Sequence, residues 1–86
     1  MEKQEAMIVL RDVLAECAGS LLARCVSLVP VVPKTLEDYG HFEVRIVCMV
    51  DDDLRRCVNI VVSNHKLAMT QTGNVIILYR PKTQET

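Results

Sequence analysis

The residues that could carry chemistry are polar side chains spread over the chain from residue 41 onward: His41, His65, Lys66, Tyr79 and Arg80. Imidazoles exchange protons near neutral pH, while an amine, a guanidinium and a phenol can stabilise developing negative charge. Brought together, such a set could bind a phosphodiester and shuttle protons during RNA cleavage. Residues of these types also lie at the ends of ordinary strands, so RNA binding or cleavage is the alternative interpretation and not the first one.

The segment from residue 41 to residue 80 is predicted to form a four-stranded antiparallel meander that would position this set. Strands are expected near 42–50, 54–63, 66–71 and 74–80, with turns at 51–53, at 64–65 and at Thr72 and Gly73. In this register apolar residues face one another on one side of the sheet, with Ile60 at its centre. The register also places His41 opposite Ser63, which gathers the polar set at one end of the sheet.

Residues 51–65 have a second interpretation, as a helix. The aspartates from Asp51 to Asp53 suit a helix N-terminus, and Leu54, Val58 and Val61 recur at helical spacing. The β-branched residues of 58–62 crowd a helix and favour a strand. The strand is therefore the first prediction, and the helix remains open.

Before Gly40 the periodicity of the polar residues is helical. It predicts a helix from about Glu5 to Val26, either continuous or split near Gly19, followed by a connector that Pro30 and Pro33 hold extended. The predicted fold class is α+β, with the N-terminal helix packed on the four-stranded antiparallel meander sheet. Residues 1–86 are expected to form a single small domain, divided into a helical region (1–28), a proline-containing connector (29–40), the sheet (41–80) and a flexible tail (81–86).

The second face of the predicted sheet is also largely apolar, although a free face of an antiparallel sheet usually alternates more cleanly. Either a flanking segment near 28–39 covers this face, or the face is an association surface. The small aliphatic core favours pairing with another chain. The first functional prediction is therefore a non-enzymatic protein association module, forming homo-oligomers or binding a protein partner through this face and exposed helix surface. The predicted interface residues are Val47, Met49, Cys57, Val61, Val75, Ile77 and Tyr79.

The charge balance narrows the range of partners. A formal net charge of −1 disfavours a chain that neutralises many phosphates, so nucleic acid is a possible partner but not a favoured one. No segment is predicted to cross a membrane, because Arg24, Pro30 and Pro33 interrupt the longest apolar stretch.

The four cysteines, Cys17, Cys25, Cys48 and Cys57, show no Cys-x-x-Cys spacing. They are predicted to be free, buried thiols in the reducing cytoplasm, and no metal or cofactor is expected. A disulfide between Cys48 and Cys57, or a structural zinc site, is a less favoured alternative.

Two parts of the chain resemble known families. Val44 to Asp53 followed by Val58 to Lys66 resembles the central hairpin of the small ribonuclease toxins of toxin–antitoxin systems, a resemblance that implies RNA cleavage. Val58 to Arg80 is similar to the last three strands of roadblock and longin-type scaffold domains, which dimerise and bind small GTPases. Neither stretch carries a diagnostic motif, so the chain is assigned to neither family.

Overall fold

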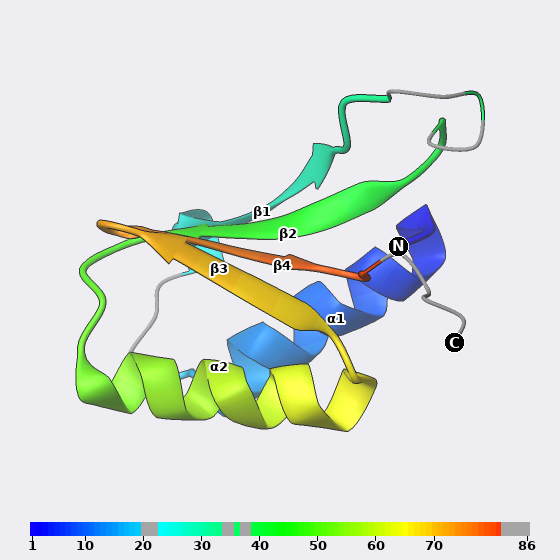
Figure 1. The fold of residues 1–86 in the computed structure, drawn as a ribbon. Coiled ribbons are helices and arrows are strands. Elements are labelled where there is room, and N and C mark those ends of the chain that lie inside the picture. Colours follow the sequence, from blue (N-terminus) through cyan, green and yellow to red (C-terminus); the bar gives the residue numbers. More distant parts are fainter. Residues whose placement is uncertain (20–22, 34–35, 37–38, 82–86) are drawn as a thin grey trace.

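The fold has two layers, a four-stranded sheet and a pair of helices on one side of it (Figure 1). The computed structural model describes residues 1–19, 23–33, 36 and 39–81. Its elements are α1 (Lys3–Glu16), η1 (Ala23–Cys25), β1 (Val26–Pro30), β2 (Phe42–Val47), α2 (Asp52–His65), β3 (Ala68–Thr72) and β4 (Val75–Tyr79). The predicted class, an α+β fold with an N-terminal helix packed on a four-stranded antiparallel sheet, is confirmed.

The strands lie in the order β1-β2-β4-β3, and each neighbouring pair is antiparallel. The hairpin between β3 and β4 closes at the pair Thr72 and Val75, with Gly73 at φ 59° inside the turn. A two-residue turn of this kind favours Asn and Gly, and Gly73 and Asn74 supply both. The turn was predicted one residue earlier. The register changes by an even number of residues, so the same side chains still share a face.

The order of helices and strands matches a known motif if β4 is placed before α1, as in a circular permutation. The order is then strand, helix, two strands, helix, strand, which is the connectivity of the ferredoxin-like, or split βαβ, motif. Arg80, just after β4, contacts Glu5 in the first turn of α1. The end of the last strand therefore lies where the first helix begins, as that cyclic relationship requires.

The core fills the space between the sheet and the two helices. Alternate residues of β2 and β4 point into it, while α1 and α2 each contribute one apolar stripe. Among the residues that the structure describes, no helix packs on the opposite side of the sheet. The aliphatic side chains with almost no exposed surface are Val9, Val13, Val44, Ile46, Leu54, Val58, Val61, Ile76 and Leu78.

The main correction concerns residues 54–63, which form most of α2 and not a strand. The helical interpretation of 51–65 is therefore the right one. The central position predicted for Ile60 is also wrong, since its side chain is 42% exposed whereas Val58 is fully buried. Both family resemblances depended on a strand beginning at or near Val58, so they lose their structural basis.

The start of α2 shows why the helix forms despite its β-branched residues. The Asp51 side chain accepts a hydrogen bond from the backbone N–H of Leu54 at 2.8 Å, which caps the helix. Asp52 and Asp53 then place negative charge in the first turn, where the helix dipole favours it. Burial of an apolar stripe on the helix outweighs the modest propensity cost of valine and isoleucine.

The N-terminal half also differs from its predicted division. The helix ends at Glu16 and not near Val26, and Val26 begins β1. Residues 1–28 are therefore not uniformly helical, and the segment predicted as a connector begins inside an edge strand that ends at Pro30, a position that tolerates proline. The residues directly after Gly19, where the predicted split would fall, and the tail from residue 82 lie outside the described residues. Within the described ranges, neither helix has the length and apolarity to cross a membrane.

Candidate functional site

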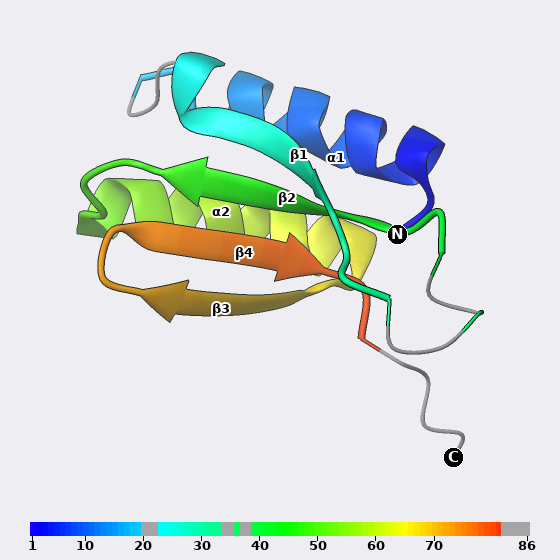
Figure 2. The same ribbon diagram turned by 90° about the horizontal axis from the view of Figure 1, so that it is seen from above.

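The side of the sheet that faces away from both helices is called the uncovered face. Because Val44, Ile46, Ile76 and Leu78 point into the core, their neighbours along each strand point outward. Figure 2 views the sheet from this side, with α2 behind it. The outward residues are Ser27 and Val29 on β1, Glu43, Arg45 and Val47 on β2, Ala68, Thr70 and Thr72 on β3, and Val75, Ile77 and Tyr79 on β4.

The strand registers place apolar and polar residues side by side on the uncovered face, with Arg45 next to the apolar residues of the two central strands. Val47 lies beside Val75 across the two central strands, and Ile77 lies beside Arg45. On the edge strand, Thr70 and Thr72 pair with Ile77 and Val75. Val47 is 44% exposed, while the three outward side chains of β4 are partly buried by their neighbours. The apolar group is therefore bordered by the threonines of β3 and by Arg45, and such a mixture of apolar and polar residues is typical of protein interfaces that form reversibly.

The predicted interface residues divide into three groups. Val47, Val75, Ile77 and Tyr79 lie together on the uncovered face. Met49 follows β2 and its side chain is 80% exposed. Cys57 and Val61 do not belong to this face, because they lie on α2, where Val61 is buried in the core and Cys57 is bonded to Cys17. Val29 was missed, because its strand had been predicted as a connector.

At the other candidate site, Arg80 connects β4 to both helices. Its guanidinium donates hydrogen bonds to the backbone oxygens of His65 at 3.1 Å and Lys66 at 3.5 Å, and it pairs with the Glu5 carboxylate of α1. A cation at these carbonyls satisfies acceptors that a helix C-terminus leaves unpaired and opposes the negative end of its dipole. Arg80 therefore has a structural explanation without a ligand.

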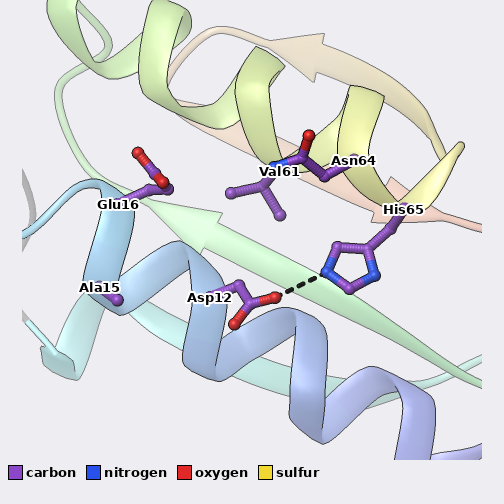
Figure 3. Close-up of a pocket in the computed structure, with 6 residues that line it drawn as sticks. All are labelled: Asp12, Ala15, Glu16, Val61, Asn64 and His65. Carbon is purple, nitrogen blue, oxygen red and sulfur yellow. Dashed lines mark hydrogen bonds and ion pairs between the residues drawn. The ribbon is translucent and has the colours of Figure 1, made fainter.

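His65 is likewise engaged within the protein. Its Nε2 lies 2.7 Å from the Asp12 carboxylate of α1 (Figure 3). This hydrogen bond is the largest cause that lowers the pKa of Asp12 from its ordinary value of 3.8, with desolvation acting in the opposite direction. The surrounding pocket, about 230 Å³ in volume, is smaller than the roughly 300–1,000 Å³ of typical ligand sites. Its lining residues are Asp12, Ala15, Glu16, Val61, Asn64 and His65.

The chemistry of this pocket does not suit RNA cleavage. The lining side chains include two carboxylates, those of Asp12 and Glu16, but no arginine or lysine. Carboxylates beside the imidazole repel the phosphates that a ribonuclease must bind.

The other predicted polar residues are directed elsewhere. His41 lies directly before β2 and forms an isolated antiparallel bridge with Glu2, and its predicted partner Ser63 lies on α2. Tyr79 pairs with Ala68 and points to the uncovered face, while Lys66 is the left-handed C-cap of α2 at φ 55°. In the described part of the chain, the five residues do not form one catalytic cluster.

The cysteines differ from the expectation of four free thiols. Cys17 and Cys57 form a disulfide that links the end of α1 to α2, with a Cα to Cα distance of 5.5 Å. Cys25 and Cys48 are free and partly buried. The alternative pairing of Cys48 with Cys57 is also wrong. Its register depended on the incorrect strand.

The described residues also provide no metal site. Among the residues that the structure describes, no three His, Cys, Asp or Glu side chains are grouped to hold an ion. Comparison with known proteins adds no identification, since no family model, curated protein or solved structure matches this chain.

Proposed function

We propose that this chain is a non-enzymatic association module that forms a homodimer through its uncovered face. The observation that carries this proposal is the apolar group formed by Val47, Val75, Ile77 and Tyr79 on the two central strands, opposite the helix layer. The face of an antiparallel sheet that stays in contact with water usually carries polar residues at such positions. Burial against a second sheet would remove this apolar surface from water.

The charges of the uncovered face favour a second copy as the occupant. Glu43 and Arg45 are the outward neighbours of Val44 on β2, one on each side of it along the strand. Two copies related by a two-fold axis across the strand at Val44 would bring each Glu43 opposite the partner's Arg45. An interface of this symmetry must be self-complementary, and one acidic and one basic residue at equal distances from the axis meet that condition.

The size of the face sets the expected affinity. Four strands of five or six residues present an outline of roughly 300 Å², given about 4.8 Å between strands and about 3.3 Å per residue. A standard stable interface buries about 800 Å² of each partner. The homodimer is therefore expected to be reversible, with a dissociation constant in the micromolar range.

The helix surface contributes less to the proposal than the sheet. Met7 and Ile8 of α1 are 54% and 40% exposed, and Ile60 of α2 is 42% exposed. Isolated exposed apolar side chains of this kind are common in monomeric proteins and need no partner.

The expected cytoplasmic location rested on four free thiols. A disulfide between Cys17 and Cys57 removes that support, since stable structural disulfides are typical of oxidising compartments. The association proposal does not depend on the compartment.

Sedimentation equilibrium over a range of concentrations tests the proposal. The wild type should pass from 9.7 kDa at high dilution to twice that mass at tens of micromolar. Ile77→Lys, at the centre of the uncovered face, should raise the dissociation constant at least tenfold, whereas the matched control Ile60→Lys on α2 should leave it unchanged. A wild-type chain that stays monomeric, including one that binds only a different protein, would contradict the homodimer.

A further inference from the structure

We propose that Cys25 and Cys48 form a second disulfide when the chain meets a small disulfide oxidant such as oxidised glutathione. The proposal begins from how the chain distributes its sulfur atoms. The existing bond, between Cys17 and Cys57, lies in the helix layer. Cys25 and Cys48, the two remaining thiols, lie in the sheet layer, at the start of β1 and just after the end of β2.

The pairing of β1 with β2 brings these cysteines together. Val26 is opposite Ile46, so Cys25, one residue before Val26, lies beside the chain as it leaves β2. The backbone N–H of Cys48 bonds to the oxygen of Asn74 at 3.1 Å, which fixes its position next to the β3–β4 turn. Both cysteines are partly buried against the core. The register therefore places the two thiols at adjacent ends of paired strands, within a short side-chain movement of each other.

The pKa of the Cys48 thiol is consistent with a position next to Cys25. Burial is the largest cause that raises the pKa of the Cys48 thiol, and the neighbouring Cys25 thiol raises it further. A raised pKa keeps Cys48 protonated at neutral pH and makes it a slow nucleophile. The pair therefore has the character of a structural bridge and not of a catalytic dithiol.

The reaction balances through thiol–disulfide exchange. One cysteine thiolate attacks oxidised glutathione, forms a mixed disulfide and releases one reduced glutathione. The second cysteine then attacks the protein sulfur of that mixed disulfide and releases the other reduced glutathione. Cys25 and Cys48 lose two electrons and two protons in total, and the oxidant gains them. Because the thiol that closes the ring must be deprotonated to attack, ring closure should accelerate as the pH rises above neutrality.

The consequence is a covalent ring around β1 and β2. The new bond would close the ends of these strands that lie opposite their connector at residues 31–41. Closing a loop restricts the unfolded chain, so the doubly bridged protein should melt at a higher temperature than the singly bridged one.

The sequence makes the test direct, because trypsin places each cysteine on a separate peptide: residues 12–24, 25–34, 46–55 and 57–66. Folded wild-type protein is incubated in glutathione buffers of increasing oxidising strength and trapped with N-ethylmaleimide. After the Cys17–Cys57 bond has formed, stronger oxidation is expected to remove N-ethylmaleimide labelling from Cys25 and Cys48 together. Peptides 25–34 and 46–55 should then be recovered as one disulfide-linked pair. The matched control Cys25→Ser/Cys48→Ser should keep the Cys17–Cys57 bond, lack the second step and show no rise in melting temperature.

Three results would overturn the proposal. Cys25 and Cys48 could remain alkylated after the Cys17–Cys57 bond has formed completely. Each could instead retain a glutathione adduct without linking to the other. The third contrary result is a linked peptide that joins Cys25 or Cys48 to Cys17 or Cys57. The variant Cys17→Ser/Cys57→Ser separates these cases, since it should still form the 25–34 with 46–55 pair.

Discussion

His65 Nε2 lies 2.7 Å from Asp12 Oδ2, so the last turn of α2 is held against the middle of α1. Replacing His65 by alanine should raise the pKa of Asp12 toward its ordinary value of 3.8, because the lost hydrogen bond is the largest cause of its lowering. Carboxyl chemical shifts of Asp12, followed by NMR through an acid titration, measure this change. An unchanged pKa would show that the contact does not persist in solution.

The same contact predicts how stability depends on pH. Since the pKa of Asp12 is lowered on folding, its contribution is complete above 3.8 and is lost as the pH falls through the lower folded value. Wild type should therefore be more stable than Asp12→Asn at neutral pH, and the two should converge in strong acid. Urea unfolding at several pH values measures the difference, and a constant difference down to the lowest pH would contradict the assignment.

Arg80 should contribute more to stability than an exposed arginine of α2. Arg80→Ala removes hydrogen bonds to the carbonyls of His65 and Lys66 and the pair with Glu5, and should cost about 1 kcal/mol. Arg56→Ala removes only an exposed pair with Asp53 and should cost about 0.3–0.5 kcal/mol. Urea unfolding of the two variants measures both losses of unfolding free energy. Equal losses would show that Arg80 does not stabilise the packing of the helices on the sheet.

A pair of aspartate substitutions tests the orientation of α2. Val58→Asp should unfold the chain, because it places a carboxylate in a fully buried site without a partner. Ile60→Asp should cost less than about 1 kcal/mol, since Ile60 is 42% exposed. Circular dichroism of the two variants distinguishes them. The reverse order would restore the strand interpretation of this segment.

RNA offers a test of the alternative function. The wild type should leave total RNA intact at neutral pH, because Asp12 and Glu16 surround His65 with negative charge. Gel electrophoresis after incubation measures cleavage. Degradation that disappears in His65→Ala, while the fold is retained, would support an RNA-cleaving role.

The sequence predicted the parts of the fold in which local pattern and tertiary structure agree. Alternation identified the strand at Phe42 and the final hairpin around Gly73, and the outward positions of Val47, Val75 and Ile77 followed from it. These side chains keep their faces even with a shifted turn, because strand periodicity is two.

The segment at 54–63 shows why the remainder of the fold was not predicted. Its valines and Ile60 have strand propensity, but the Asp51 cap and the buried spacing of Leu54, Val58 and Val61 decide for a helix. With a strand assigned to 54–63, the predicted sheet already had four strands. The pattern therefore gave no reason to assign a strand at Val26, which is where the first strand of the structure begins. The contacts of His65 with Asp12 and of Arg80 with Glu5 join residues far apart in sequence, and no local pattern marks them.

A charge exchange on the uncovered face tests the homodimer most directly. In Glu43→Arg or Arg45→Glu alone, like charges would meet twice across the two-fold axis, so each variant should dimerise at least tenfold more weakly than wild type. An equimolar mixture of the two variants should dimerise again at low salt, because opposite charges then face each other at both sites. Sedimentation equilibrium of each variant and of the mixture measures this outcome. Recovery of the dimer only on mixing is the predicted result; single variants that match wild type, or a mixture that remains monomeric, would contradict association through this face.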